Sequence, residues 1–322
     1  MPVNTKAIKR RIKSVGSTKK ITRAMEMISA VKMRKAIEAA VNTRTYATLA
    51  WDLLVKLSGV KKVEFPLLEV RPVKKLLVIL ITSNRGLCGS FNANIIKKTA
   101  LQLADPRNIS RQRVENGVLE TSGQVEVDVV GVGKKGADFA KKMGYNLIAS
   151  FSEFSDTPKL NDVLPITKMV IDEYQKKTYD KVVVAYTDFK STINQVAKLR
   201  QVLPISQFDL EKMLSDLNTD IEEKNSELRT LNSELELDDY IFEPTQDNVL
   251  EIILPRLVET QVFQAMLESS ASEHSARMLA MRNASDAASD MIKELSLIFN
   301  KARQAGITQE IAEIAGGAAA LE

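Results

Sequence analysis

The sequence pattern that most resembles a chemical site is the glycine-rich segment Gly131-Val-Gly133-Lys-Lys-Gly136, which lies between an apolar run and a helical pattern. Glycines at this spacing let backbone N–H groups approach a pyrophosphate, and an acidic residue about twenty positions on, here Asp156, would bind the ribose. Two details disagree with a dinucleotide site. The motif follows the second apolar run of its region, and Asp156 lies in the polar segment Ser155-Asp-Thr-Pro158. A glycine-rich turn between a strand and a helix is the interpretation we favour.

A second candidate is Gly86-Leu-Cys88-Gly-Ser90, which resembles a phosphate-binding loop but lacks the Lys-Ser/Thr pair of a P-loop. Cys88 is the single cysteine, so it forms no internal disulfide, and a reducing compartment is expected. As a nucleophile it would need a base, and the single histidine, His274, falls in a helical stripe far along the chain. The sequence has no spacing typical of metal ligands. We therefore predict no catalytic, cofactor-binding or metal-binding residue, and no cofactor.

Charge is distributed unevenly along the chain, although the formal net charge is only +4. Residues 1–62 hold fifteen Lys and Arg against three acids, whereas residues 209–239 hold eleven acids against three bases. The basic beginning favours an anionic partner and leaves a nucleic-acid-binding interpretation open, with Lys9, Arg10 and Arg11 as its test residues. It also resembles an organelle transit peptide, but the helical pattern continues past Glu26 without a cleavage-like break. No apolar run reaches the length of a transmembrane helix.

The elements that would position these residues begin with a long helix. From about Asn4 to Ser58 there is no proline and one glycine, Gly16. The apolar residues at three-to-four spacing, which marks one helical face, are Ile8, Ile12, Val15, Ile21, Met25 and Ile28. A helix of about 50 residues is roughly 75 Å long, so it is expected to extend beyond a compact domain.

Between this helix and residue 207 the pattern changes to that of an α/β domain. The helical pattern stops at a linker with Pro66 and Pro72. Strands are expected at 76–81, 125–130, 147–151 and 182–186, a hairpin partner at 193–203, and helices at 93–103, 137–143 and 163–174. Alternation of this kind predicts a mostly parallel sheet with helices on its faces, in a Rossmann-like domain over 73–207.

Two heptad patterns follow the α/β domain. The first, at 208–238, predicts an acidic helix that either packs on its own domain or contacts another chain; its seam is Leu210, Leu214, Leu217, Ile221, Lys224, Leu228, Leu231 and Leu235. The second lies in a C-terminal helix over 245–322, which Pro255 is expected to kink or interrupt. Its seam is Leu267, Ala271, His274, Met278, Met281, Ser285, Ala288, Ile292, Leu295, Phe299 and Ala302.

The two long helices at 1–60 and 245–322 are expected to pair with each other, because a lone helix of that length is not stable on helix propensity alone. The domain between them returns the chain to the point where it left the first helix, so antiparallel pairing is sterically easy. The predicted fold class is therefore an antiparallel coiled coil of the N- and C-terminal helices, with a central Rossmann-like α/β domain.

Several specific strings resemble one family, the gamma subunit of F-type ATP synthases. They occur in collinear order over nearly the whole chain, except near 209–238. They are Ile21-Thr-Arg-Ala-Met-Glu-Met27, Ser83-Asn-Arg-Gly-Leu-Cys-Gly89 with Phe91-Asn92, Ser272-Glu-His-Ser-Ala-Arg-Met278, and Phe299-Asn-Lys-Ala-Arg-Gln-Ala-Gly-Ile-Thr-Gln-Glu-Ile311 with Gly316-Gly-Ala-Ala-Ala320. The resemblance implies a non-catalytic central stalk that transmits torque between an ion-driven membrane ring of c subunits and a catalytic ring of alpha and beta subunits.

The same resemblance implies partners and contact residues. The partners would be the alpha, beta and epsilon subunits and the c-ring, without nucleic acid and without a membrane span of its own. Gln304 and Thr308 match positions that hydrogen-bond a loop of beta, and Met25 and Arg277 match positions that face each other or beta. The early basic residues, including Arg10 and Arg11, would face acidic beta surfaces. The expected location is peripheral, on the cytoplasmic face of the bacterial inner membrane.

The chain departs from the family pattern at the acidic helix of 208–238. We expect this helix to brace the domain or to contact epsilon or the c-ring. The redox cysteine pair of the chloroplast forms is absent, since Cys88 stands alone. A dinucleotide-dependent enzyme and a nucleic-acid-binding coiled coil remain as the competing classes.

Overall fold

The computed structural model describes residues 5–58, 65–105, 112–114, 117–119, 125–155, 157–205 and 246–319. The predicted acidic helix of 208–238 and Asp156 lie outside these residues. The chain divides into two compact units. The first holds the beginning of the N-terminal helix, up to Val31, and the end of the C-terminal helix, from Arg277. The second holds the chain from Lys32 to Ala276.

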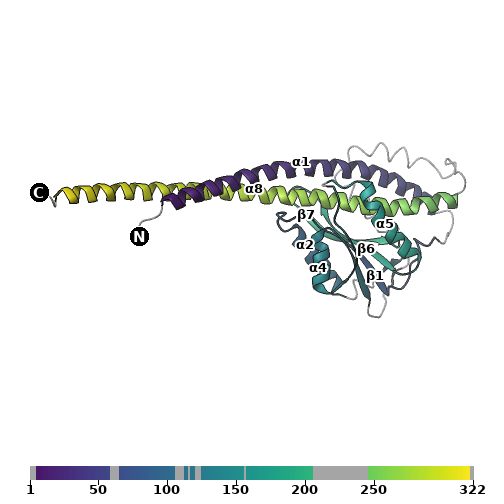
Figure 1. The fold of residues 1–322 in the computed structure, drawn as a ribbon. Helices are drawn as coiled ribbons and strands as arrows, with labels where there is room; N and C mark the ends of the chain where they lie inside the picture. Colours follow the sequence, from purple (N-terminus) through teal and green to yellow (C-terminus); the bar gives the residue numbers. More distant parts are fainter. Residues whose placement is uncertain are drawn as a thin grey trace. The chain divides into compact units, whose positions relative to one another are not determined.

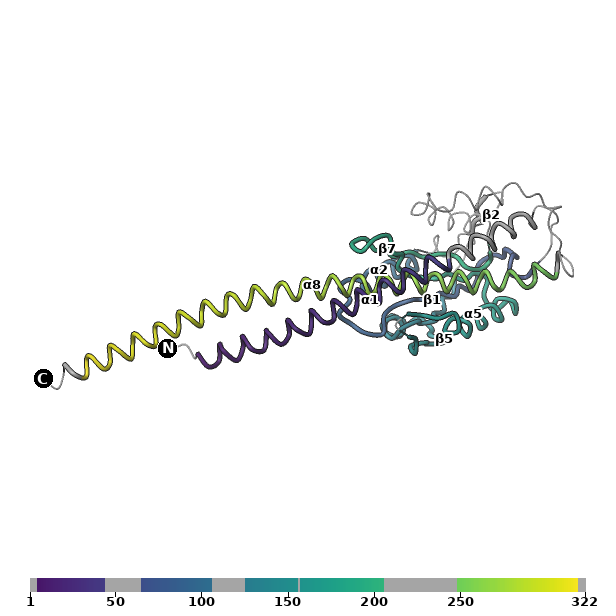
Figure 2. The backbone as a smooth tube through the Cα atoms, turned by 90° about the horizontal axis from the view of Figure 1, so that it is seen from above, coloured from purple at the N-terminus to yellow at the C-terminus, as the bar shows by residue number. Residues whose placement is uncertain are grey.

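The two long helices form as predicted. Helix α1 covers Thr5–Ser58 and helix α8 covers Gln246–Ala319. In the first unit they lie side by side and run in opposite directions (Figures 1 and 2). Pro255 does not interrupt α8, which continues through it. Proline lacks an N–H group, so only the bond to the carbonyl of Glu251, an exposed residue, is missing there.

The second unit is built on a five-stranded sheet with the order β5-β4-β1-β6-β7. Its strands are β1 (Lys75–Ile81), β4 (Glu126–Val132), β5 (Asn146–Phe151), β6 (Lys181–Phe189) and β7 (Gln195–Leu203). The first four are parallel to their neighbours, and β7 forms an antiparallel hairpin with β6. A small separate hairpin joins β2 (Gln112–Val114) to β3 (Gly117–Leu119).

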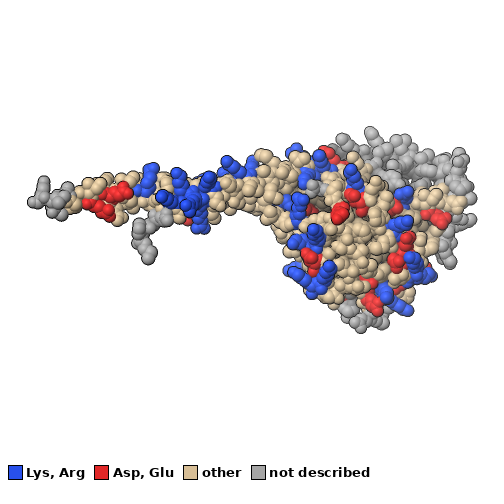
Figure 3. Space-filling view, in the orientation of Figure 1, with Lys and Arg blue, Asp and Glu red and all other residues tan. Residues whose placement is uncertain are grey.

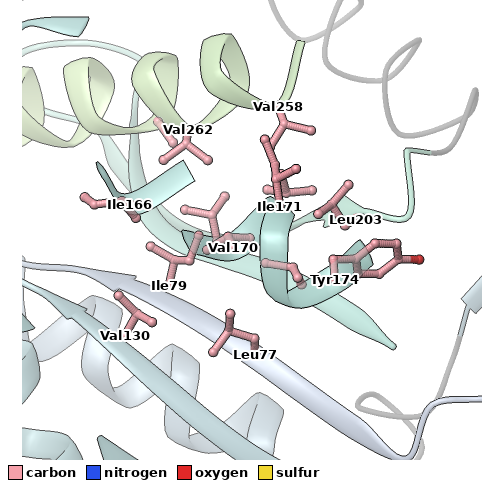
Figure 4. Packing of buried hydrophobic residues seen from close by; sticks show 14 of the residues in the cluster. Leu77, Ile79, Val130, Ile166, Val170, Ile171, Tyr174, Leu203, Val258 and Val262 are labelled. Carbon is pink, nitrogen blue, oxygen red and sulfur yellow. The ribbon is translucent and has the colours of Figure 1, made fainter. Parts of the chain in front are cut away.

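Helices cover both faces of this sheet, as the alternation of strands and helices predicts. On one face lie α2 (Phe91–Leu103) and α4 (Lys134–Met143). On the other lie α5 (Leu160–Gln175) and the part of α8 around Val258 and Val262 (Figure 4). Successive residues of β1 point to opposite faces, so Ile79 packs against α5 while Val78 packs toward α2. This is why β1 reads as a continuous apolar run.

Candidate partner-binding surfaces

The contact between α1 and α8 in the first unit contains more hydroxyl groups than the sequence pattern suggests. Thr22 and Ser29 of α1 are 8% and 2% exposed, and Ser285 of α8 is 4% exposed. The hydroxyls of Thr22 and Ser285 lie 2.7 Å apart and share a hydrogen bond. Met281 and Ala288 on either side of Ser285 are also buried. The predicted α8 seam is therefore correct from Met281 to Ala288, and Ser285 is hydrogen-bonded across it.

The predicted inner face of α1 is wrong at two positions. Ile21 is 61% exposed and Ile28 is 53% exposed, although their spacing with Met25 predicts that they face α8. The physical reason is that α1 has apolar residues on two faces, and the face with Thr22 and Ser29 is the one that meets α8.

The outward face of α1 forms an apolar stripe, which we call the α1 stripe. It consists of Ile21, Met27, Ile28 and Val31, each more than half exposed. Ile21, Ile28 and Val31 are separated by seven and three residues, so they lie along one side of the helix. Large apolar side chains grouped in this way mark a contact surface, since scattered ones would not line up.

The end of α8 carries a second exposed surface. Every described side chain from Arg303 to Gly317 is exposed. Three isoleucines there, at four-and-three spacing, form what we call the α8 stripe; they are Ile307, Ile311 and Ile314, and they are 49%, 61% and 74% exposed. Gln304 and Thr308 share this side of the helix, because they precede Ile311 by seven and three residues.

The remaining predicted contact residues have different environments. Arg10 and Arg11 are exposed, and Lys and Arg side chains gather over part of the first unit (Figure 3). Met25 is partly buried, while Arg277 is only 7% exposed. Because the helices are antiparallel and Thr22 meets Ser285, Arg277 lies opposite position 30, roughly 7 Å along the helix from Met25. Arg277 is therefore enclosed within the chain, whereas the two arginines of α1 are open to a partner.

The glycine-rich segment that joins β4 to α4 uses its backbone N–H groups inside the protein. The N–H of Lys134 donates to Asn84 Oδ1 (3.1 Å) and that of Lys135 donates to the carbonyl of Ser83 (3.3 Å). The N–H of Gly136 donates to Thr82 Oγ1 (2.8 Å). These are the donors that a pyrophosphate would bind at the start of a helix. The three residues that follow β1 accept these hydrogen bonds instead.

The glycines themselves are explained by the same close packing. Gly133 has a φ of +96°, and a Cβ there would lie 2.2 Å from the carbonyl oxygen of Thr82. A Cβ at Gly136 would lie 2.9 Å from the hydroxyl oxygen of Thr82. The motif therefore lets β1 and α4 approach each other, which supports the interpretation as a structural turn.

The cysteine of the loop after β1 belongs to a buried hydrogen-bond network. Cys88 is 3% exposed, and its sulfur accepts a hydrogen bond from Asn92 Nδ2 at 3.2 Å. Asn92 also donates to Ser83 Oγ and accepts from the Ser83 N–H. His274 lies on α8, where it is 4% exposed. The loop residues of the motif quoted above thus hold the start of α2 against the end of β1.

The serines of the motif Ser272–Met278 have a role that sequence reasoning missed. Ser272 Oγ donates to the carbonyl of Thr187 (3.2 Å), and Ser275 Oγ donates to the carbonyl of Thr192 (2.7 Å). Gln195 Nε2 donates to the same Thr192 carbonyl at 2.8 Å. The two serine bonds attach α8 to the β6–β7 hairpin. The only sequence signal for this role was the number of small polar residues among the apolar residues of this helix.

Among the residues described, no three His, Cys, Asp or Glu side chains are grouped so that they could hold a metal ion. Within the same residues, no helix is both long and apolar enough to span a bilayer.

Paired helices with exposed apolar stripes are typical of a protein that binds other proteins, and the amides that would bind a phosphate in the Rossmann-like unit are occupied. A family model described as ATP synthase matches residues 4–321. The ATP synthase gamma chain of Roseiflexus castenholzii is 40% identical over 323 residues, which is 99% of this chain and 98% of the relative. That of Legionella pneumophila is 36% identical over 317 residues, which is 98% and 99%. This chain therefore belongs to the ATP synthase gamma-chain family.

Solved structures with a similar fold come from mitochondrial ATP synthases. A chain of the Tetrahymena thermophila mitochondrial ATP synthase central stalk and c-ring superposes with a TM-score of 0.54 at 25% identity, covering 82% of this chain and 99% of that one. A chain of the Euglena gracilis mitochondrial enzyme gives a TM-score of 0.60 at 19% identity, covering 98% and 94%, and shows the fold alone. The predicted fold class is confirmed.

Proposed function

We propose that this chain is the rotating central stalk of a bacterial ATP synthase and that it catalyses no reaction itself. It would pass torque between the c-ring in the membrane and the ring of alpha and beta subunits. The observation that carries this proposal is the pair of exposed apolar stripes on the paired helices. The relatives that match this chain over nearly their whole length are ATP synthase gamma chains.

A mechanical role explains why the chain consists of long paired helices. One charge moving through about 100 mV releases only about 2.3 kcal/mol, so the energy of several ions must be combined to drive one catalytic cycle. The connecting element must therefore resist twisting while it accumulates torque. Helices paired through small residues such as Ser285 and Ala288 approach closely, and close packing resists deformation.

The exposed surfaces suggest where each partner would bind. We propose that the α1 stripe and the α8 stripe contact the alpha and beta subunits. Gln304 and Thr308 would form hydrogen bonds to beta. Arg10 and Arg11 would face acidic groups of beta. Met25, which is partly buried, would contribute to the same surface. Arg277, which is enclosed within the chain, would hold α1 and α8 together.

We assign the remaining contacts to the rest of the rotor. The second unit, over the proposed domain range 73–207, would contact epsilon and the c-ring, and the segment 208–238 is proposed to brace it or to join that contact. The complex would be peripheral on the cytoplasmic face of the inner membrane. Bacterial relatives at 36–40% identity support this location.

Co-purification tests the function directly. We expect the chain, produced with alpha and beta subunits, to be recovered with both. In membranes that hold the c-ring and the rest of the complex, it should couple their ATP hydrolysis to ion pumping. Turnover of a substrate by the chain alone would contradict the proposal, and so would salt-dependent binding to nucleic acid without binding to alpha and beta.

The contact assignment has a separate test. Replacing Gln304 and Thr308 together with Ala should lower coupled pumping more than it lowers assembly, because it removes two hydrogen-bonding groups and leaves the helix intact. Gln309→Ala is the matched control, since Gln309 donates to Glu313 on its own helix at 2.9 Å. Equal loss of assembly and coupling, or an equal effect of the control, would remove Gln304 and Thr308 from the contact.

A further inference from the structure

The hydroxyl pair in the first unit forms a complete hydrogen-bond chain. Thr22 Oγ1 donates to the carbonyl of Lys19 at 3.0 Å, so its hydrogen is used within α1. At the 2.7 Å contact the hydroxyl of Ser285 is then the donor and Thr22 Oγ1 the acceptor. Both residues are buried, so water does not replace either bond. In this arrangement the hydrogen of each hydroxyl has an acceptor.

The sequence of α1 offers a competing way to pack against α8. Turning α1 about its own axis by about one residue, roughly 100°, would bring Ile21 and Ile28 into the seam in place of Thr22 and Ser29. Two large apolar side chains would then be removed from water, which is favourable. Ser285 would lose the oxygen of Thr22 and keep only a carbonyl of its own helix as acceptor. Hydrophobic burial and the hydroxyl pair therefore favour different rotations of the same helix.

We propose that Thr22 and Ser285 are positioning residues that set the rotation of α1 against α8 and so keep the α1 stripe turned outward. A buried polar pair is suited to this task, because its hydrogen bond depends on direction, whereas apolar contact does not. The proposed consequence for coupling rests on the proposed function of the chain. The rotation itself does not depend on that function.

Cysteine cross-linking in the assembled complex measures the rotation of α1 relative to α8. Ser29 and Met278 are each seven residues from the hydroxyl pair, in opposite directions along antiparallel helices, so they lie opposite each other. A Ser29→Cys and Met278→Cys pair reports the native rotation, and an Ile28→Cys and Met278→Cys pair reports the alternative. Both are made in a Cys88→Ser background so that no other thiol competes.

Each reporter is combined with Thr22→Val and Ser285→Ala, which keep the shapes nearly unchanged and remove the hydrogen bond. We expect the ratio of alternative to native cross-links to rise about tenfold, as loss of one buried hydrogen bond allows. The exchanged pair, Thr22→Ser with Ser285→Thr, should restore the native ratio. Ser285→Ala alone is the milder variant if the double variant does not assemble.

The outcomes separate the two proposals. An unchanged cross-link ratio in the hydroxyl-free variants overturns the positioning role, as does failure of the exchanged pair to restore it. A changed ratio with full ion pumping per ATP hydrolysed supports the positioning role and removes the α1 stripe from the proposed contact. A changed ratio with a loss of pumping that the exchanged pair reverses supports both.

Discussion

At the scale of single residues, Gly133 shows how a motif can resemble one chemistry and serve another. Its positive φ and the carbonyl of Thr82 leave no room for a side chain. The sequence alone reveals the glycines and the helix that follows them. It does not reveal that Asn84, Ser83 and Thr82 supply acceptors to that helix, because those residues lie about 50 positions away and meet it only through the parallel pairing of β1 with β4.

We predict that Gly133→Ala lowers the free energy of unfolding by about 3 kcal/mol or more, since it adds a steric clash to an unfavourable backbone conformation. Gly144→Ala is the matched control, because Gly144 also has a positive φ (+76°) but its Cβ would meet nothing within 4 Å. That variant should lose only about 1 kcal/mol. Urea titration of both proteins measures the difference; equal losses would show that the contact with Thr82 is unimportant.

Tyr179 gives a pH-dependent prediction at the same scale. Its hydroxyl donates to Asp128 Oδ2 at 2.8 Å. Burial, then the hydrogen bond and the charge of Asp128, raise the pKa of Tyr179 above its ordinary value. The protonated phenol is therefore favoured in the folded state. Its contribution to stability is fully present below the unfolded pKa of about 10, and it is lost as the pH rises toward the higher folded pKa.

We expect Tyr179→Phe to lower the free energy of unfolding at pH 7 by about 1.5–3 kcal/mol, the range for hydrogen bonds to charged groups. The difference from the parent protein should shrink above about pH 10. Denaturant titrations of both proteins at several pH values measure this. A difference that stays constant through the alkaline range would contradict the assigned hydrogen bond.

At the scale of elements, the helices and the strands of the five-stranded sheet could be predicted from the sequence because their patterns are uninterrupted. The short hairpin of β2 and β3 was not predicted. The four parallel strands follow from apolar runs, and α8 follows from its heptads. The rotation of α1 could not be predicted, since Ile21 and Ile28 form as regular a pattern as the residues that meet α8. Periodicity identifies an apolar face but not the molecule that covers it.

The hairpin of β6 and β7 provides the element-scale test. We predict that Ser275→Ala increases hydrogen exchange at the amides of the turn between these strands by about fivefold to tenfold, because the variant loses the bond to Thr192. Ser289→Ala is the control, since its hydroxyl donates to the carbonyl of Ser285 on its own helix. Equal exchange in the two variants would mean that Ser275 does not hold the hairpin.

At the scale of the whole molecule, the proposed assembly accounts for the exposed stripes. The side chains of the α1 stripe are more than half exposed, so replacing them should leave the isolated chain intact. Sequence reasoning reached the assembly through the family motifs, while composition and periodicity indicated only a long helical pair. The outward stripe was missed because the same isoleucines were assigned to the seam.

We predict that Ile21→Asn with Ile28→Asn leaves the unfolding of the isolated chain unchanged within about 0.5 kcal/mol, the usual range for surface changes. Recovery with alpha and beta subunits should fall at least several-fold. Ser14→Asn with Thr18→Asn, two exposed positions on the same helix, is the control. Normal recovery of the isoleucine variant would exclude the α1 stripe from the assembly contact.

The amides at the start of α4 are already hydrogen-bonded, which matters for a subunit that would work close to catalytic sites that bind ATP. A domain of Rossmann type with open amides would compete for adenine nucleotides and would change its rigidity as their concentrations rose and fell. Here Thr82, Ser83 and Asn84 act as permanent internal substitutes for phosphate oxygens. The stiffness of this unit is accordingly expected to remain the same in an energy-rich and an energy-depleted cell.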